Sequence, residues 1–116
     1  MEYVGLQNRL STLPAFISTG QSKLAALMRA IVVNPETIFY DEPVANLDKP
    51  SQHLIKKIMK ETLKNNITSI IVTHEFQEFE DMIDKVIVLK DKTIYKVDTY
   101  KNIKKSKDEF IKSLIV

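Results

Sequence analysis

The segment IFYDEPVANLD, residues 38–48, decides how the rest of this chain is interpreted. A short apolar and aromatic run ends in two adjacent acids, Asp41 and Glu42, and Pro43 follows at once. A carboxylate at the end of a buried element is costly to desolvate unless a metal, a cation or a proton neutralises it. The pair therefore predicts a chemical site. The plain structural alternative is that Asp41 caps the next segment and Glu42 is a solvated surface acid.

The composition is that of one ordinary globular domain. The chain has 116 residues, of which 44% are hydrophobic and 28% charged, and its net charge is +2. This charge is too small to indicate nucleic acid as a partner. The absence of cysteine excludes disulfides and thiolate metal sites. No apolar run reaches the roughly 18 residues of a membrane-spanning helix.

Helical and strand-like patterns alternate around the opening segment. Ser18 is a suitable N-cap with Gln21 as its capping-box partner, and Asn34-Pro35 ends the helix that follows. The expected helices cover 1–10, 18–33, 49–66, 75–83 and 108–116, and the expected strands cover 36–41, 67–73, 85–90 and 93–98, the last two joined by the turn Asp91-Lys92. This alternation predicts an α/β fold with a mostly parallel sheet, covered on both faces.

Two of the predicted strands end in chemically capable groups. The first ends in Asp41-Glu42 and the second in Thr73-His74-Glu75. Because ligands gather at the carboxyl ends of parallel strands, we expect Asp41, Glu42 and His74 to converge on one pocket mouth. A carboxylate there can hold magnesium, a second can polarise an attacking water, and a histidine can hydrogen-bond a phosphate. His74 taken alone is more often a packed or surface histidine.

Four motifs, taken in order, resemble the second half of an ABC-type ATPase nucleotide-binding domain. ISTGQ, residues 17–21, is similar to the signature L-S-G-G-Q, and IFYDEP to the Walker B strand with its catalytic glutamate. ANLD, residues 45–48, resembles the D-loop, and IVTHE, residues 71–75, the switch-histidine loop. MRAIVVNPE and DKVIVLKDKTIY extend the likeness, which covers nearly the whole chain.

The resemblance implies a role for each matching residue. Asp41 would bind Mg²⁺ through water, Glu42 would be the general base, and His74 would contact the γ-phosphate of ATP. Asp48 would communicate across a head-to-tail dimer with a second ATPase subunit. The residues of the signature segment, which would face ATP held by the other subunit, are Ser18, Thr19, Gly20 and Gln21. A helix that opens at Ser18 supports this, because helix N-termini attract phosphate.

The sequence also departs from the family pattern. Thr19 stands where the family has a glycine, Ile17 and Leu24 replace a usual leucine and a common arginine, and Lys92 occupies a turn where glycine is common. Nothing resembles the phosphate-cradling loop G-x-x-x-x-G-K-[ST], and Gly5 and Gly20 are too few glycines to build one.

We therefore expect a C-terminal portion of a P-loop NTPase (RecA-like) fold. Residues 1–34 would be a remnant of the helical subdomain, and residues 35–116 the C-terminal part of the ATPase core. The sheet should lack the P-loop strand, which the family places between the strand that ends at His74 and the strand over 85–90. A chain without this loop is not expected to hydrolyse ATP by itself.

By the same resemblance, the chain would serve an ABC transporter as its ATP-binding subunit. The implied cofactors are ATP and Mg²⁺, the partners are transmembrane permease subunits and a second ATPase subunit, and the location is the cytoplasmic side of the membrane. MEYVGL and DEFIKSLI are similar to segments of phospholipid-trafficking, organic-solvent-resistance transporters. This narrower similarity implies phospholipid as cargo.

Two other interpretations remain open. Chromosome-maintenance and DNA-repair ATPases also carry these motifs on a lobe without the P-loop, but no heptad repeat precedes residue 17 and the charge is near neutral. A non-catalytic remnant acting as an interaction module is the other. The lysines of KNIKKSKDEFIK, residues 101–112, are interpreted as a solvated face because acids interrupt them.

Overall fold

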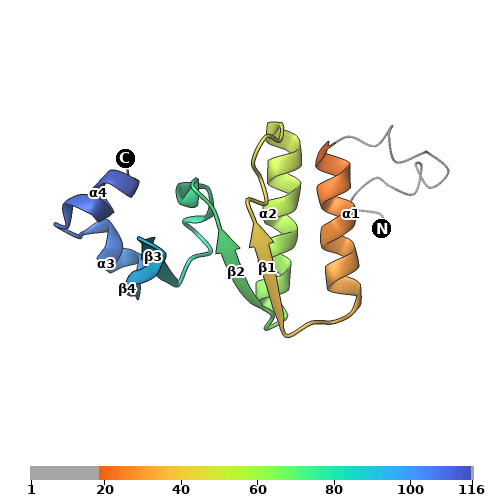
Figure 1. Ribbon diagram of the computed structural model, residues 1–116. Coiled ribbons are helices and arrows are strands. Elements are labelled where there is room, and N and C mark those ends of the chain that lie inside the picture. The colour runs from red at the N-terminus through yellow and green to blue at the C-terminus, as the bar shows by residue number, and fades with distance from the viewer. Residues whose placement is uncertain (1–18, 116) are drawn as a thin grey trace. The chain divides into compact units, whose positions relative to one another are not determined.

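The computed structural model describes residues 19–115, so the expected helix over 1–10 and the predicted cap Ser18 lie outside the described residues. The elements, in chain order, are α1 (Thr19–Val32), β1 (Thr37–Asp41), α2 (Lys49–Lys64), β2 (Thr68–Val72), the 3-10 helix η4 (Phe76–Phe79), β3 (Lys85–Lys90), β4 (Thr93–Thr99), α3 (Tyr100–Lys104) and α4 (Glu109–Ile115) (Figure 1). They form two compact units, the first ending at Thr73 and the second beginning at His74. No helix within 19–115 is both long and apolar enough to cross a bilayer.

The first unit is built on a parallel pair of strands. β1 and β2 run side by side with Thr37 opposite Thr68 and Asp41 opposite Val72. Parallel neighbours need a crossover connection, and α2 provides it. Both α1 and α2 lie on one side of the strand pair (Figure 1). The buried apolar side chains of this unit are Leu24, Leu27, Ile38, Tyr40, Val44, Ile55, Ile58, Met59 and Ile67.

The other face of the strand pair is exposed. Phe39, Val72 and Ile70 keep 74%, 57% and 40% of their surface accessible. They alternate along the strands with the buried Ile38 and Tyr40, so they share one face. The prediction of a sheet covered on both faces is therefore wrong for the described residues, because α1 and α2 cover only one.

The N-terminal turn of α1 packs closely on α2. Gly20 is buried, and a Cβ built there would lie 2.6 Å from Oγ and 3.0 Å from Cβ of Ser51. Real Cβ atoms do not approach this closely, so a side chain at position 20 would force Ser51 to move. The glycine at this position therefore has a structural reason in the contact between the two helices.

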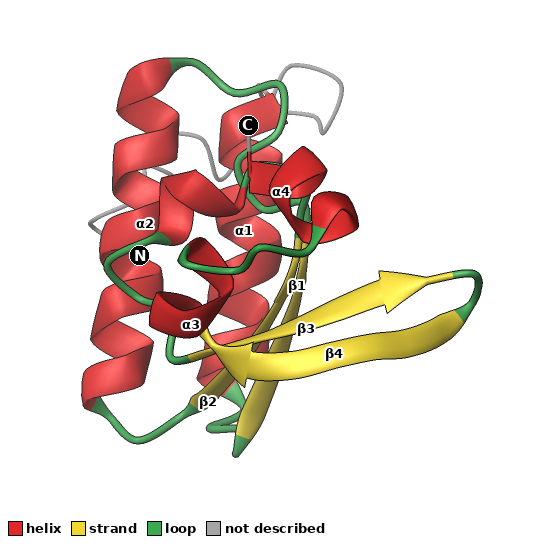
Figure 2. Ribbon diagram, turned by 90° about the vertical axis from the view of Figure 1, so that its left-hand side faces the viewer, coloured by secondary structure: helices red, strands yellow, loops and turns green. Residues whose placement is uncertain are grey.

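The second unit holds an antiparallel hairpin of β3 and β4, with Lys85 opposite Thr99 (Figure 2). Its turn residues, Asp91 and Lys92, have φ of 51° and 65°, as in the left-handed turns that suit hairpins. The predicted turn is confirmed, with a lysine where glycine is favoured. The core of this unit comprises Val88, Ile103 and Ile111.

The strands of the described residues pair only as β1–β2 and β3–β4, in two separate sheets. No ladder joins β2 to β3 among these residues. The expected strand between β2 and β3 has no counterpart among the described residues, and its place in the sheet stays a prediction. Each sheet consequently leaves unpaired strand edges.

Two elements differ from the sequence-based expectation. The helix predicted over 75–83 is only the short 3-10 turn Phe76–Phe79. The helix α3 was not predicted and overlaps the start of the lysine-rich stretch interpreted as a solvated face. It forms because Thr99 caps it and because Tyr100 and Ile103, three positions apart, are both buried.

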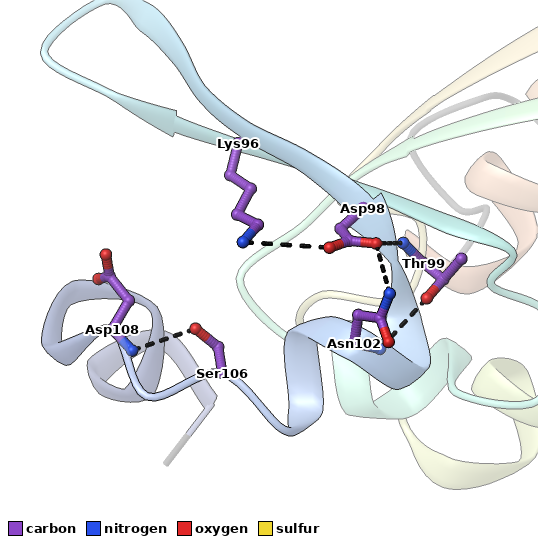
Figure 3. Close-up of polar contacts among 6 residues, drawn as sticks. All are labelled: Lys96, Asp98, Thr99, Asn102, Ser106 and Asp108. Atoms are coloured by element: carbon purple, nitrogen blue, oxygen red, sulfur yellow. Dashed lines mark hydrogen bonds and ion pairs between the residues drawn. The ribbon is translucent and has the colours of Figure 1, made fainter.

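Side-chain caps define the short C-terminal helices, and Figure 3 shows the cap of α3. Thr99 Oγ1 accepts a hydrogen bond from the backbone N–H of Asn102 at 3.2 Å. Asp98 Oδ1 accepts one from the side-chain amide Nδ2 of Asn102 at 2.8 Å. Asp108 Oδ1 accepts the N–H of Ile111 at 3.1 Å, and Tyr95 donates its hydroxyl to Asp108 Oδ2. These bonds favour the ionised carboxylates.

The contact of Gly20 with Ser51 predicts energetic coupling between the two residues. Gly20→Ala should leave stability unchanged or lower it, because the helix-propensity gain of up to about 1 kcal/mol is offset by displacement of the serine hydroxyl. In a Ser51→Ala background the same change should be more favourable by about 0.5 kcal/mol or more. Urea unfolding of the four proteins measures this coupling. Ser22→Ala, on the exposed side of α1, is the control and should be additive with Ser51→Ala; additivity at Gly20 would contradict the contact.

The bond from Tyr95 predicts a measurable titration effect. The Tyr95 hydroxyl, followed by the N–H of Ile111, lowers the pKa of Asp108 below its usual value. A carboxyl whose folded pKa is depressed stabilises the fold above its unfolded pKa, and this stabilisation is lost as pH falls through the folded pKa. Tyr95→Phe should raise the pKa of Asp108 in a carboxyl ¹³C NMR titration. The pKa of Asp98, lowered by Asn102 and Thr99, should stay constant in the same spectra.

Candidate functional site

Glu42 follows β1 in a left-handed backbone conformation. Its φ is 46°, which costs a residue with a Cβ roughly 1–2 kcal/mol. Its N–H donates to the carbonyl of Val72 at 2.8 Å, which extends the β1–β2 ladder by one bond. A strained residue directly after a strand is the kind of outlier that accompanies functional positions.

The side chain of Glu42 is tied to the end of β2. Thr73 Oγ1 donates to Glu42 Oε2 at 3.0 Å in a part-buried position. The ends of both strands therefore meet at this acid, while the predicted convergence of Asp41, Glu42 and His74 on one pocket mouth stays a prediction. His74 is the next residue along the chain and its side chain is exposed.

Lys23 holds the same turn from α1. Its Nζ donates to the carbonyl oxygen of Glu42 at 2.8 Å and to that of Ala45 at 3.1 Å. Hydrogen bonds from a charged donor contribute about 1.5–3 kcal/mol each, enough to offset the strain at Glu42. From the other helix, Gln52 Nε2 donates to the carbonyl of Leu47 at 3.0 Å.

Sequence reasoning missed Lys23, and it named Thr73 at the end of the second strand without a role toward Glu42. Lys23 is the single lysine of the helix predicted over 18–33, and Thr73 stands between the apolar strand and His74. A lysine in an amphipathic helix ordinarily indicates a solvated face. For Lys23 the only signal was its position in this helix, from which the side chain reaches the segment that follows β1.

Asp41 is the last residue of β1 and is exposed. Strand alternation places it on the same uncovered face as Phe39. The described residues contain no group of three His, Cys, Asp or Glu side chains that could hold a metal. Magnesium usually takes one or two protein carboxylates and keeps several waters, so a lone accessible aspartate fits a water-mediated contact.

The predicted signature residues open α1. Thr19 is its first residue, and the first-turn N–H groups of a helix have no intrahelical acceptor. Gly20 is buried beside Ser51, and a Cβ built there would lie 4.0 Å from Leu47 Cδ2, so this turn lies next to the segment that runs from Glu42 to Asp48. Gln21 is half-buried. The structure thus brings α1 and the D-loop-like segment together within the first unit.

Asp48 occupies the N-cap of α2 without acting as a side-chain cap. Its backbone is extended, with φ −68° and ψ 162°, and the carboxylate makes no capping hydrogen bond. Its carbonyl accepts the N–H of Gln52 at 3.0 Å. The exposed carboxylate is therefore not explained by the helix that it precedes.

No family model matches the chain. Among curated proteins, an uncharacterized ABC transporter ATP-binding protein of Methanocaldococcus jannaschii is 41% identical over 97 residues, covering 84% of this chain and 43% of that protein. The ATP-binding protein of an intermembrane phospholipid transport system in Haemophilus influenzae is 31% identical over 109 residues, covering 93% of this chain and 41% of that protein. The chain thus spans less than half the length of these relatives.

The solved structures that resemble this chain are also ATP-binding cassettes. A nucleotide-free ATP-binding cassette from an ABC transporter superimposes with a TM-score of 0.82 at 25% identity, over 99% of this chain and 46% of that one. A dimeric ATP-binding cassette in a post-hydrolysis state, bound to ADP and Pi, superimposes with a TM-score of 0.65 at 28% identity, over 74% of this chain and 37% of that one.

The geometry of Asp48 predicts that its removal is mild for stability. Asp48→Ala should cost clearly less than the typical 1 kcal/mol or so of a lost helix cap, since no cap bond is broken. Thr99→Ala, which removes the cap of α3, should cost about that amount. Asp48→Asn serves as the matched variant that removes only charge. Urea unfolding compares the three, and a loss at Asp48→Ala equal to that at Thr99→Ala would show that the aspartate does cap α2.

Proposed function

The chain belongs to the ATP-binding cassette family of ABC transporters, and we propose that it supplies the signature, Walker B, D-loop and switch-histidine segments of an ATP-hydrolysing transport subunit. The observation that carries the proposal is the junction of β1 and β2. There Glu42 is tied to Val72 through its backbone and to Thr73 through its carboxylate. The M. jannaschii relative, 41% identical, supports the assignment of these motifs.

In this proposal each residue at the strand ends has one task. Glu42 takes a proton from the water that attacks the γ-phosphate of ATP, and the Thr73 hydroxyl fixes the orientation of its carboxylate. Asp41 would hold Mg²⁺ through water, and the ion would neutralise phosphate charge when bound. His74 donates a hydrogen bond to the γ-phosphate. Ser18, Thr19, Gly20 and Gln21 would contact ATP bound to a second subunit, and Asp48 would communicate across the dimer interface.

We further propose that a segment carrying a phosphate-cradling loop completes the site. No such loop occurs among the 116 residues. The uncovered face of β1 and β2, with Phe39 74% and Val72 57% exposed, is the kind of surface that another layer covers in parallel sheets. This covering layer would lie over the face that carries Asp41.

The proposed partners are a second ATPase subunit, in a head-to-tail dimer, and transmembrane permease subunits on the cytoplasmic side of a membrane. The dimeric cassette bound to ADP and Pi supports the dimer. Phospholipid is the narrower proposal for the cargo. It is supported by the segments MEYVGL and DEFIKSLI and by 31% identity to the phospholipid-system protein of H. influenzae.

A complementation assay tests this function. The purified chain alone should show no Mg²⁺-dependent ATP hydrolysis, because the phosphate loop supplies most of the ground-state binding. Mixing it with a separately expressed P-loop-bearing half of an ABC cassette should produce hydrolysis. Glu42→Gln should lower the rate by about 100-fold or more, the usual contribution of a general base.

The matched control is Glu61→Gln, an exposed acid on α2 that should leave the rate unchanged. Turnover by the pure chain that Glu42→Gln abolishes would contradict the need for a further loop. A mixture that binds the P-loop half but never hydrolyses ATP would favour the non-catalytic interaction module. Salt-dependent binding of DNA by the chain would favour the chromosome-maintenance class.

A further inference from the structure

We propose that Lys23 is a positioning residue that holds Glu42 in its left-handed conformation and thereby couples the position of α1 to that of the acid. The inference rests on the proposed function in one respect, the role of Glu42 as general base. The contacts that carry it are independent of that role.

The first observation is where the lysine donates. Nζ lies 2.8 Å from the carbonyl oxygen of Glu42 and 3.1 Å from that of Ala45, so one ammonium group binds two main-chain acceptors of the same turn. An ammonium group has three donors, and charge-assisted bonds of this length are the strong ones. Lys23 is part-buried, unlike a lysine on a solvated face.

The second observation is the conformation that these bonds accompany. Glu42 has φ 46°, and Pro43 after it disfavours the right-handed helical alternative. An extended backbone at Glu42 would point its carbonyl and its carboxylate away from the directions that they have in the structure. The left-handed state is thus the one in which the N–H meets Val72, the carboxylate meets Thr73 and the carbonyl meets Lys23.

The third observation is the place of Lys23 along α1. It lies within one turn of Gly20 and Gln21. These two residues belong to the segment that is proposed to face the nucleotide of a second subunit. Gly20 is in close contact with Ser51 on α2, so α1 is seated on a defined neighbour. A displacement of the first turn of α1 would move Nζ relative to the two carbonyls. The lysine therefore links three motifs that are separate in the sequence.

Nuclear magnetic resonance of the isolated chain tests the conformational part. The readouts are the ¹³Cα shift of Glu42 and its HN–Hα coupling constant, which report φ. Lys23→Met, which keeps length but removes the donors, should move both readouts toward extended values. Lys23→Arg should restore them, and Lys57→Met, at an exposed lysine on α2, should leave them unchanged.

The hydrolysis assay with a P-loop-bearing half tests the functional part. Lys23→Met should lower kcat by about 10-fold or more with KM little changed, since misplacement of a catalytic group affects the chemical step. Lys23→Arg should recover most of the rate. Lys57→Met should again behave as the unmodified chain.

The possible outcomes separate the conformational role of Lys23 from its effect on catalysis. Unchanged Glu42 resonances in folded Lys23→Met would overturn the inference. A changed conformation with unchanged kcat would overturn the coupling to catalysis. An unmodified mixture that never hydrolyses ATP would refute the proposed function, while the resonance comparison would still decide the role of Lys23. If Lys23→Met does not fold, Lys23→Leu, which also removes the donors, replaces it in both measurements.

Discussion

The parallel pairing of β1 with β2 is the constraint on which the candidate site depends. Its register sets Asp41 opposite Val72, and the next N–H along β1, that of Glu42, then meets the Val72 carbonyl at 2.8 Å. From this bond it follows that Glu42 and Thr73 are neighbours across the ladder. A slip of one residue would exchange the two faces of the strand, placing Phe39 under the helices and Tyr40 outside. Burial of the core and placement of the acid are thus fixed together.

The elements that sequence reasoning predicted well are those set by local pattern. α1 and α2 follow from apolar residues at helical spacing, and the four strands from short β-branched and aromatic runs. α3 escaped prediction because its five residues are too few to show a period. It exists because Thr99 caps it and because Tyr100 and Ile103 find buried surroundings, which a local pattern does not reveal.

The residues of the site, too, could be predicted only where a local sequence pattern marked them. The pair Asp41-Glu42 was visible as an apolar run ending in acids. The contacts that shape it were not, because Lys23 is 19 positions from Glu42 and Thr73 is 31 positions away. Gly20 shows the converse, since a residue assigned to phosphate binding by motif also has a packing reason beside Ser51. The motif indicates a role for Gly20 in phosphate binding, and only the fold shows that the same residue is also needed for packing.

The uncovered face of the strand pair joins stability to chemistry. Phe39 and Val72 lose apolar exposure only if another layer covers them, and that burial is favourable at about 25 cal/mol per Å². Asp41 lies on the same face, so the covering layer would also exclude water from around its carboxylate. Electrostatic contacts to magnesium and phosphate strengthen when water is excluded. In the proposed assembly, the segment that stabilises this sheet is therefore the same segment that creates the environment in which Asp41 can act.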